Sequence, residues 1–560
     1  MHCNDGNEEG GSLGSPLTRG ESCLQRFVSQ AGDEDARSRY REEEADNNVT
    51  QHNHGSISSG NDDRSIIAFE PHDPQRKKAF IVFTSMVTVV NSTMGSALPS
   101  NAIPYFTKEW GVTSQIQRTL PIAIFLVGYI FGPIVWAPLS EQFGRRWLIV
   151  GTFVMFCIWT LACALAPNWP AFLVFRLLVG IFASAPIALV AGVMADVYGE
   201  YRTRGRAMAS FFAATVFGPL FAPIISGFCS PTIGWRWTFW IGLIYAGLSM
   251  VLVLLLPETY GPVLLVKRAQ RIRRLDAKAN VIAPHELEAA DLHQLAVRVL
   301  TRPMRMLFFE LIVSATCVYL ALCYGIFYMT FQAYPIIFQE MYGLSPGVEG
   351  LCFLPIGAGA LCALPVFFSW DAYLEKAQAE GRPWTKKEEY RRVPLACIGG
   401  PLFVISLFWL GWTSREGIPF WVPMLAGIPF GCGFQLIFMA LLNYITDAYE
   451  IFAASANAAA SCTRSVLGTV LPFACTPMFR RLGIAGACSL LGGLSCLVSI
   501  IPFIFIWKGE RIRAGSRFCI ALREQREEME MRVEEQRCKD KRGGYGDRNG
   551  VVEQQRKEEA

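Results

Sequence analysis

The residues best placed to do chemistry in this sequence are an acid and two bases in one short turn. In the stretch PLSEQFGRRWLIVGTF, Glu141 is followed closely by Arg145 and Arg146. Gly144 permits a turn that a side chain would hinder. We expect Arg145 to pair with Asp196, and Glu141 to face the positive N-terminal end of a helix further along the chain. Such contacts would latch two parts of the chain together; alternatively, the two arginines are only charged anchors.

Other ionisable residues lie in or beside long apolar runs, where a charge is costly and usually functional. Arg176 either extends to a polar surface or has such a function. Arg464 either faces a cavity or pairs with Asp447. An ion pair with Arg305 is the leading interpretation of Glu310, which is also our first candidate for binding a proton or a cation.

Aromatic and amide side chains in the same runs suggest a binding site for an organic molecule. An aromatic wall with a few amides suits amphiphilic compounds or cations, through stacking and cation–π contacts. Simple packing is the alternative for the aromatic residues. The candidate binding residues are Asn91, Tyr324, Tyr328, Gln332, Gln435 and Asn443.

Several kinds of chemistry are not supported by the sequence. All six histidines lie outside the apolar runs, and the 17 cysteines show no CxxC spacing. A GxxxxGK[ST] phosphate loop is absent. We therefore expect no metal site, no cofactor, no ATP hydrolysis and no enzyme activity.

The elements that must position these residues are membrane-spanning helices. Of 560 residues, 52% are hydrophobic and 18% are charged, and the charges gather in 1–78, 257–306, 371–392 and after 507. Between them lie twelve charge-free runs, nearly all long enough to cross ~30 Å of hydrocarbon as a helix. Arg176 alone separates two of them, 148–175 and 177–195. The helices of a soluble enzyme would be more amphipathic, so we predict an all-α integral membrane protein.

The charge distribution also predicts the organisation of the chain. Six spans precede a basic linker and six follow it, which indicates two similar bundles. The basic residues between spans place both termini in the cytoplasm and suggest membrane lipid, not nucleic acid, as their partner. The predicted segments are a disordered tail 1–75, a six-helix bundle 76–256, a linker 257–306 with amphipathic helices, a second six-helix bundle 307–507, and a tail 508–560.

A faint internal repeat supports two related halves. Ala195-Asp196-Val197-Tyr198, at the end of the fourth span, has a counterpart in Thr446-Asp447-Ala448-Tyr449, at the end of the tenth. Repeats of this kind are typical of symmetric transporters.

Four motifs in order resemble the major facilitator superfamily, in the form seen in fungal twelve-span drug:proton antiporters. They are GPIVWAPLSEQFGRR at 132–146, RLLVG at 176–180, GPLFAP at 218–223 and GWRWTFW at 234–240. NYITDAY at 443–449, followed by Ser455, Ala456 and Arg464, fits the same group. The sequence departs from the family at Ala137, where many members have glycine, at Glu141, which replaces aspartate, and at Ala222, which replaces another glycine.

The resemblance implies roles for particular residues. Arg176 would take part in proton coupling, with Glu310, Arg464 and Asp447 as further candidates. Gly218 and Pro219 would bend the fifth span or allow close helix packing. The resemblance implies that the kink seals the inward leak, and a purely structural kink is an equal alternative. The resulting gating set is Glu141, Gly144, Arg145, Arg146, Asp196, Gly218 and Pro219.

The function implied by the resemblance is export of drugs, toxins or secondary metabolites in exchange for protons. The protein would act as a monomer in the plasma membrane, with a small-molecule substrate, protons and lipid as its partners. A polyamine exporter is an alternative, although the scarcity of deep acids argues against polyamines. A proton-coupled nutrient importer or uniporter is another, and a non-transporting membrane sensor is the alternative from a different class.

Overall fold

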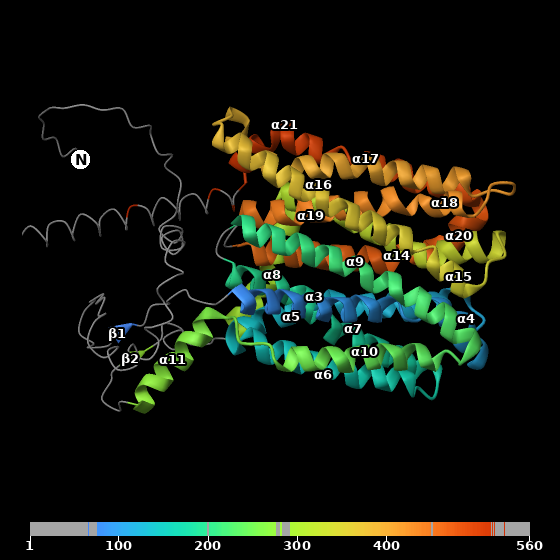
Figure 1. The fold of residues 1–560 in the computed structure, drawn as a ribbon, viewed down its shortest axis with the longest axis horizontal. Helices are drawn as coiled ribbons and strands as arrows, with labels where there is room; N and C mark the ends of the chain where they lie inside the picture. The colour runs from blue at the N-terminus through green and yellow to red at the C-terminus, as the bar shows by residue number, and fades with distance from the viewer. Residues whose placement is uncertain are drawn as a thin grey trace, which may run out of the picture.

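The computed structural model describes residues 65–66, 75–198, 201–275, 281–282, 292–449, 452–516, 518, 520 and 531. Most of the predicted tails, including 1–64 and 532–560, lies outside the described residues. The helices run side by side along the long axis of one elongated bundle, with the first half in blue to green and the second in yellow to red (Figure 1).

The first half consists of helices that are joined by short turns. Their bounds are α3 Gln75–Ala97, the 3-10 helix η2 Ser100–Ala102, α4 Ile103–Glu109, α5 Gln115–Phe143, α6 Arg145–Ala164, α7 Trp169–Ala183, α8 Ala185–Val197, α9 Tyr201–Thr232 and α10 Arg236–Leu254.

The predicted linker contains helices at both of its ends. They are α11 Gly261–Leu275 and α13 Leu292–Phe309. Between them, the two-residue strand β2 Val281–Ile282 pairs in parallel with β1 Ser65–Ile66. We call the end of the bundle from which α11 projects the linker end, and the opposite end the α15 end (Figure 1).

The second half repeats the pattern of the first. Its elements are α14 Leu311–Tyr334, the π-helix η3 Pro335–Met341, α15 Pro346–Leu351, α16 Leu354–Ala379, the 3-10 helix η4 Pro383–Lys386, α17 Glu389–Thr413, α18 Trp421–Leu425, α19 Gly427–Tyr449, α20 Ala453–Val498 and α21 Ile501–Ala514.

The structure confirms the twelve-helix membrane fold. Within the described residues, eleven helical stretches are long and apolar enough to span a membrane, and the last covers 62 residues, 453–514. As one straight helix that stretch would be about 90 Å long, three times the hydrocarbon thickness. It breaks at Gly483, whose φ of 69° and ψ of 173° are not helical, so it supplies the eleventh and twelfth spans.

Arg176 stands between two charge-free runs, but it does not mark the turn between the third and fourth spans. The third span ends at Ala164, and the fourth begins at Trp169, where the Asn168 side chain accepts a hydrogen bond from the Ala171 N–H at 3.0 Å. Arg176 therefore lies inside the fourth span and does not separate two spans. A single charge did not end the helix because its side chain finds partners inside the bundle, as described below.

The outer surface of the bundle is apolar, as lipid contact requires. On α10, Ile244, Leu248, Val251 and Leu255 recur at helical spacing, and each is between 58% and 69% exposed. A water-soluble protein rarely leaves such a continuous apolar stripe uncovered. The lipid-facing side of the helix is thus apolar, while its small residues Gly242 and Ala246 pack inward.

Candidate functional site

A cavity lies between the two halves and is lined by both of them. Its aromatic residues come chiefly from α14 and α19, and helix α9 forms the facing wall. The lining residues are Thr93, Ile187, Phe211, Phe212, Thr215, Val216, Pro219, Tyr324, Phe327, Tyr328, Phe434, Gln435, Phe438 and Arg464. Of the predicted binding residues, the structure thus brings Tyr324, Tyr328 and Gln435 together.

Arg464 supplies the charge among these lining residues. It lies on α20, is 9% exposed, and its guanidinium donates one described hydrogen bond, to Ser461 Oγ at 3.2 Å. The guanidinium carbon also lies 5.6 Å from the centre of the Tyr324 ring, over its face. The expected alternative, an ion pair with Asp447, does not form.

Three predicted binding residues lie outside the cavity lining. Asn91 donates hydrogen bonds to Val87 O at 2.9 Å and Ser249 Oγ at 2.7 Å, so it joins α3 to α10. Asn443 donates to Met439 O of its own helix at 2.8 Å. Gln332 is half-buried on α14 and is not among the lining residues. Sequence alone could not decide this because the helices are apolar on most of their faces.

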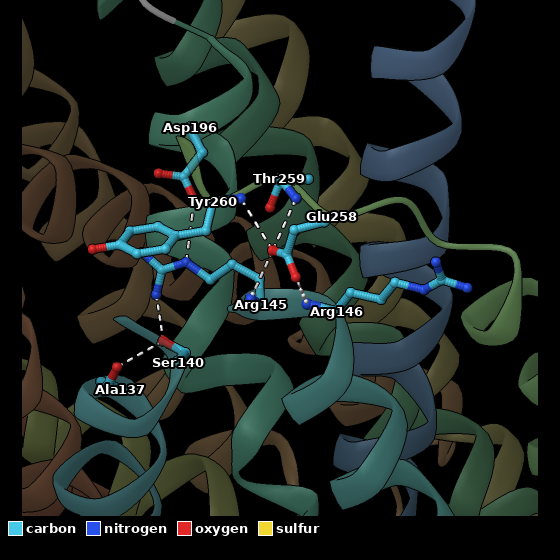
Figure 2. A network of polar contacts seen from close by, with 8 residues as sticks. All are labelled: Ala137, Ser140, Arg145, Arg146, Asp196, Glu258, Thr259 and Tyr260. Atoms are coloured by element: carbon cyan, nitrogen blue, oxygen red, sulfur yellow. Dashed lines mark hydrogen bonds and ion pairs between the residues drawn. The ribbon is translucent and has the colours of Figure 1, made fainter. Parts of the chain in front are cut away.

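The charged turn at the linker end is held by an acid that the motif does not contain. Glu258, after α10, accepts hydrogen bonds from the backbone N–H of Arg145 at 2.8 Å and of Arg146 at 3.3 Å (Figure 2). It also accepts from the N–H groups of Thr259 and Tyr260, each at 3.1 Å. The carboxylate thus caps the positive N-terminus of α6. The signal in the sequence was an isolated acid directly after the sixth span.

Arg145 forms the ion pair with Asp196 that the sequence predicted. Its Nε lies 3.1 Å from Asp196 Oδ2, and its guanidinium also donates to Ser140 Oγ (Figure 2). The same guanidinium lies over the Tyr260 ring, 5.0 Å from its centre. Arg146 instead donates to Leu254 O at 3.1 Å.

The ion pair between Arg145 and Asp196 does not join the two halves as expected, because both residues belong to the first half. No hydrogen bond or ion pair of the Glu141 carboxylate is described within the resolved ranges, and the residue is half-buried. The contact with the start of the eleventh span therefore stays a prediction.

The ion pairs that do join the halves at the linker end start from α9. Arg206 Nη2 lies 2.8 Å from Asp371 Oδ2 on α16, and Arg202 Nη1 lies 2.8 Å from Glu375 Oε1 one turn further on. Asp371 is 5% exposed. These contacts close the bundle at this end.

Asp447, the counterpart of Asp196 in the internal repeat, has an arginine partner in its own half. Arg392 Nε lies 3.5 Å from Asp447 Oδ2, and Arg204 of α9 approaches Oδ1 at 3.9 Å. Each half thus holds an arginine–aspartate pair at the linker end, and among the ion pairs of the described residues only the second is also approached from the other half.

The α15 end is closed by a buried hydrogen-bonded cluster. Asn101 Nδ2 donates to Glu349 Oε2 at 2.6 Å and to Pro346 O at 3.1 Å, which connects the first half to α15. Gln339 Nε2 donates to Asn101 Oδ1 at 3.3 Å. Glu349 is fully buried, and its Oε1 has no hydrogen-bond partner within the described residues. In the sequence, Glu349 stands directly before the charge-free run 350–370, where nothing distinguishes it from an acid outside the membrane.

Glycines allow the helices to approach closely at this end. A Cβ on Gly227 of α9 would lie 2.3 Å from Pro346 O, and one on Gly350 would lie 2.8 Å from Pro223 O. Gly218 has a different role, because a Cβ there would lie 2.6 Å from Met94 N of α3 in the same half. Of the two expected interpretations for the GPLFAP motif, close packing is therefore seen at Gly218, while Pro219 lines the cavity.

Arg176 is buried without a carboxylate partner among the described residues. Its guanidinium donates to three backbone carbonyls: Pro121 O at 2.9 Å, Gly95 O at 2.7 Å and Ser96 O at 2.9 Å. The guanidinium carbon also lies 4.6 Å from the centre of the Phe125 ring. These contacts tie α7 to α3 and α5, and they explain why the charge stays inside the span.

Glu310 lies at the N-terminal end of α14, away from the cavity lining. Its Oε2 accepts hydrogen bonds from Tyr449 Oη at 3.0 Å and from Ser516 Oγ. The ion pair expected with Arg305 is not among its described contacts. Glu310 thus joins the start of the seventh span, the end of the tenth and the segment after α21.

The cavity is small in this conformation. Counted as the space open to the centre of a water molecule, its volume is about 50 Å³, whereas one water needs roughly 10–15 Å³ on the same measure. It has room for a few waters. Polar contacts join the two halves both at the linker end and at the α15 end of the bundle.

Comparison with known proteins identifies the family. The family model of the Major Facilitator Superfamily matches residues 85–472, more than two thirds of the chain. The chain belongs to the major facilitator superfamily. It is 35% identical over 459 residues to "Efflux pump FUB11" of Gibberella moniliformis, covering 80% of this chain and 76% of that relative.

Other major facilitator proteins agree with this assignment. The "Citrinin biosynthesis cluster MFS transporter mrr1" of Monascus ruber is 36% identical over 464 residues, covering 80% of this chain and 91% of the relative. Among solved structures, the proton:xylose symporter XylE matches with a TM-score of 0.57 at 17% identity, covering 78% of this chain and 96% of XylE. That likeness concerns the fold alone.

Membership of the major facilitator superfamily makes this protein a multi-pass membrane transporter and not an enzyme. The cavity between its two halves is then the candidate substrate site. The contacts at the linker end and the α15 end are the candidate gates.

Proposed function

We propose that the protein exports small organic compounds, such as drugs, toxins or secondary metabolites, in exchange for protons. The observation that carries this proposal is the aromatic cavity between two halves that touch at both ends. The relative named as an efflux pump supports the direction of transport, and the relative named as a biosynthesis-cluster transporter supports the class of cargo.

Alternating access follows from the different chemistry of the two closures. Ion pairs from α9 to α16 close the linker end, and a hydrogen-bonded cluster around Asn101 and Glu349 closes the α15 end. Either set can break while the other holds, which exposes the cavity to one side at a time. We place the linker end and both termini in the cytoplasm, with the protein acting as a monomer in the plasma membrane.

Proton coupling is supported by the carboxyl groups at these closures. Protonation of Asp371 would remove the charge that Arg206 binds and so weaken the linker-end closure. Glu349 is buried in the α15-end closure with one unpartnered oxygen, and it would become accessible to protons when that end opens. Arg176, Arg464 and Asp447 remain candidates for coupling, whereas the Glu310 carboxylate is occupied by its contacts with Tyr449 and Ser516.

Efflux from loaded membrane vesicles tests the function directly. Vesicles would be loaded with a panel of fluorescent neutral, anionic and cationic dyes, and release would be followed with and without a protonophore. We expect faster release than from vesicles lacking the protein, and loss of that release when the proton gradient collapses. Release that ignores the protonophore would indicate a uniporter, and a protein that moves no compound would be a sensor.

A further inference from the structure

We propose that the cargo of this cavity is an organic acid, with a carboxylate that binds Arg464 and Gln435 and a flat ring that packs on the aromatic wall. The inference rests on the proposed function, in which this cavity is the cargo site. It adds the chemical class of the compound.

The described lining of the cavity carries a positive charge and no negative charge. Among its described lining residues, Arg464 is charged and no Asp or Glu is present. Burying a guanidinium without a carboxylate is costly. The described ion pairs of the chain do not include Arg464, and one hydrogen bond is described for its five N–H donors. The cavity therefore favours an anion.

The neighbouring polar groups point to the same chemistry. Gln435 is 1% exposed, and its Nε2 has no hydrogen-bond partner within the described residues. The hydroxyls of Thr93 and Thr215 already donate to carbonyls of their own helices, at 2.9 Å and 2.6 Å. The N–H groups of Arg464 and Gln435 that have no described partner are thus suited to a ligand that accepts hydrogen bonds, as a carboxylate does.

The rings beside Arg464 define the rest of the ligand. Phe434 lies 4.3 Å from Phe438 and 5.0 Å from Phe327, measured between ring centres, and Phe438 lies 6.2 Å from Tyr324. These residues form a continuous aromatic wall that reaches the guanidinium. A compound with an aromatic or conjugated ring next to its acid group matches both parts, and its binding requires the cavity to widen beyond the volume of about 50 Å³ that it has in this conformation.

The same geometry disfavours the cationic cargo that the aromatic residues first suggested. The face of Tyr324 is already occupied by the Arg464 guanidinium, and a second positive charge beside it would be repelled. The described residues that line the cavity include no acid to offset that repulsion. Polyamines and other organic cations are therefore poor candidates.

The test is binding of matched ligands to the purified full-length protein in lipid nanodiscs. The probes are benzoate, 1-naphthoate and 9-anthracenecarboxylate, each compared with its carboxamide and its aminomethyl analogue. We expect at least one carboxylate to raise the melting temperature and to bind about tenfold or more tightly than its amide, because the carboxylate adds a charge-assisted hydrogen bond. The ammonium analogues should bind most weakly.

Variants assign the preference to Arg464. Arg464→Gln should abolish the difference between carboxylate and amide, Arg464→Lys should retain part of it, and Gln435→Leu should reduce it. Arg382→Gln removes the same charge from the exposed turn near η4 and should leave binding unchanged. Size-exclusion profiles and unliganded melting temperatures show whether each variant is folded.

Several results would overturn the proposal. If no carboxylate outbinds its amide, if an ammonium compound binds best, or if Arg464→Gln retains the preference, the cavity does not select acids. Binding needs no proton gradient, so these results would not contradict the proposed export function. Conversely, tight carboxylate binding without gradient-driven release from vesicles would contradict the function and leave the ligand class intact.

Discussion

At the residue scale, Gly144 shows how a turn depends on a distant side chain. Its φ of 91° and ψ of 159° lie in a region that is essentially restricted to glycine. A Cβ at this position would also lie 2.5 Å from Glu258 Oε2. The glycine is thus needed both for its backbone conformation and for the approach of the carboxylate that caps α6.

Gly144→Ala should destabilise the folded protein by about 1–3 kcal/mol, the usual cost of forcing a side chain into this backbone region. The melting temperature of the purified variant measures the effect. Gly151→Ala is the matched control, because Gly151 lies inside α6 with no atom within 4 Å of an added Cβ, and it should be neutral or slightly stabilising. Equal melting temperatures for the two variants would show that the strain at Gly144 is unimportant.

At the element scale, α9 makes the closure at the linker end. Its first turns carry Arg202, Arg204 and Arg206, each of which approaches a carboxylate of the second half. Gly205 leaves space for Arg392, whose Nη2 would lie 2.4 Å from an added Cβ. The helix thus connects the gate at the linker end to the cavity wall at Phe211 and Pro219.

Arg206→Gln should favour opening at the linker end, because it removes the charge that binds Asp371. A thiol introduced by Thr215→Cys, in a background without native cysteines, reports opening by its labelling rate with a membrane-impermeant maleimide. We expect labelling from the linker side to rise roughly two- to fivefold, as an ion pair worth ~0.4–1 kcal/mol implies.

A control for this prediction lies within the first half. Arg236 is about as exposed as Arg206, at 41% against 45%, and its ion pair with Glu109, at 2.9 Å, does not join the halves. Arg236→Gln should therefore leave labelling unchanged. Exchanging the charges with Arg206→Asp and Asp371→Arg should restore the slow rate. An unchanged rate in Arg206→Gln would mean that this pair does not hold the gate.

At the scale of the whole molecule, the two halves meet through ion pairs at the linker end, and through close backbone packing together with the Asn101–Glu349 hydrogen bond at the α15 end. Gly227 and Gly350 bring α9 and α15 so close that neither position has room for a side chain. A rocking motion of the halves must therefore separate this contact between α9 and α15, which we call the seam, before the cavity opens to that side.

Gly350→Leu should wedge the halves apart at the α15 end and trap the protein open to that side. An added Cβ would lie 2.8 Å from Ile224 Cα, which is backbone and cannot move aside cheaply. We expect the Thr215→Cys reporter to label faster from the α15 side, and dye release to fall. Gly247→Leu, on the exposed face of α10 with no atom within 4 Å of an added Cβ, is the control. If Gly350→Leu released dye at the normal rate, the contact between α9 and α15 would not need to close in each transport cycle, and the prediction would be wrong.

The sequence alone was informative where one physical signal dominates. Long charge-free runs predicted the membrane helices, and the alternation of spans placed Arg145 and Asp196 at the same end of the bundle, where they form the expected pair. The cavity was predicted in part: Tyr324, Tyr328, Gln435 and Arg464 line it, whereas Asn91 does not. An apolar helix shows no polar face from which its orientation can be deduced.

What the amino-acid sequence determined by itself was therefore the membrane fold and the positions of its charged turns, because hydrophobicity and charge act on each segment separately. The tertiary structure decided which residues face one another: Glu258 against the turn at Gly144, Arg206 against Asp371, and Arg464 against the aromatic wall. These contacts join residues far apart in the chain, and their distances are set by how the helices pack. Close packing, unlike hydrophobicity, is a property of the assembled helices and not of any one segment.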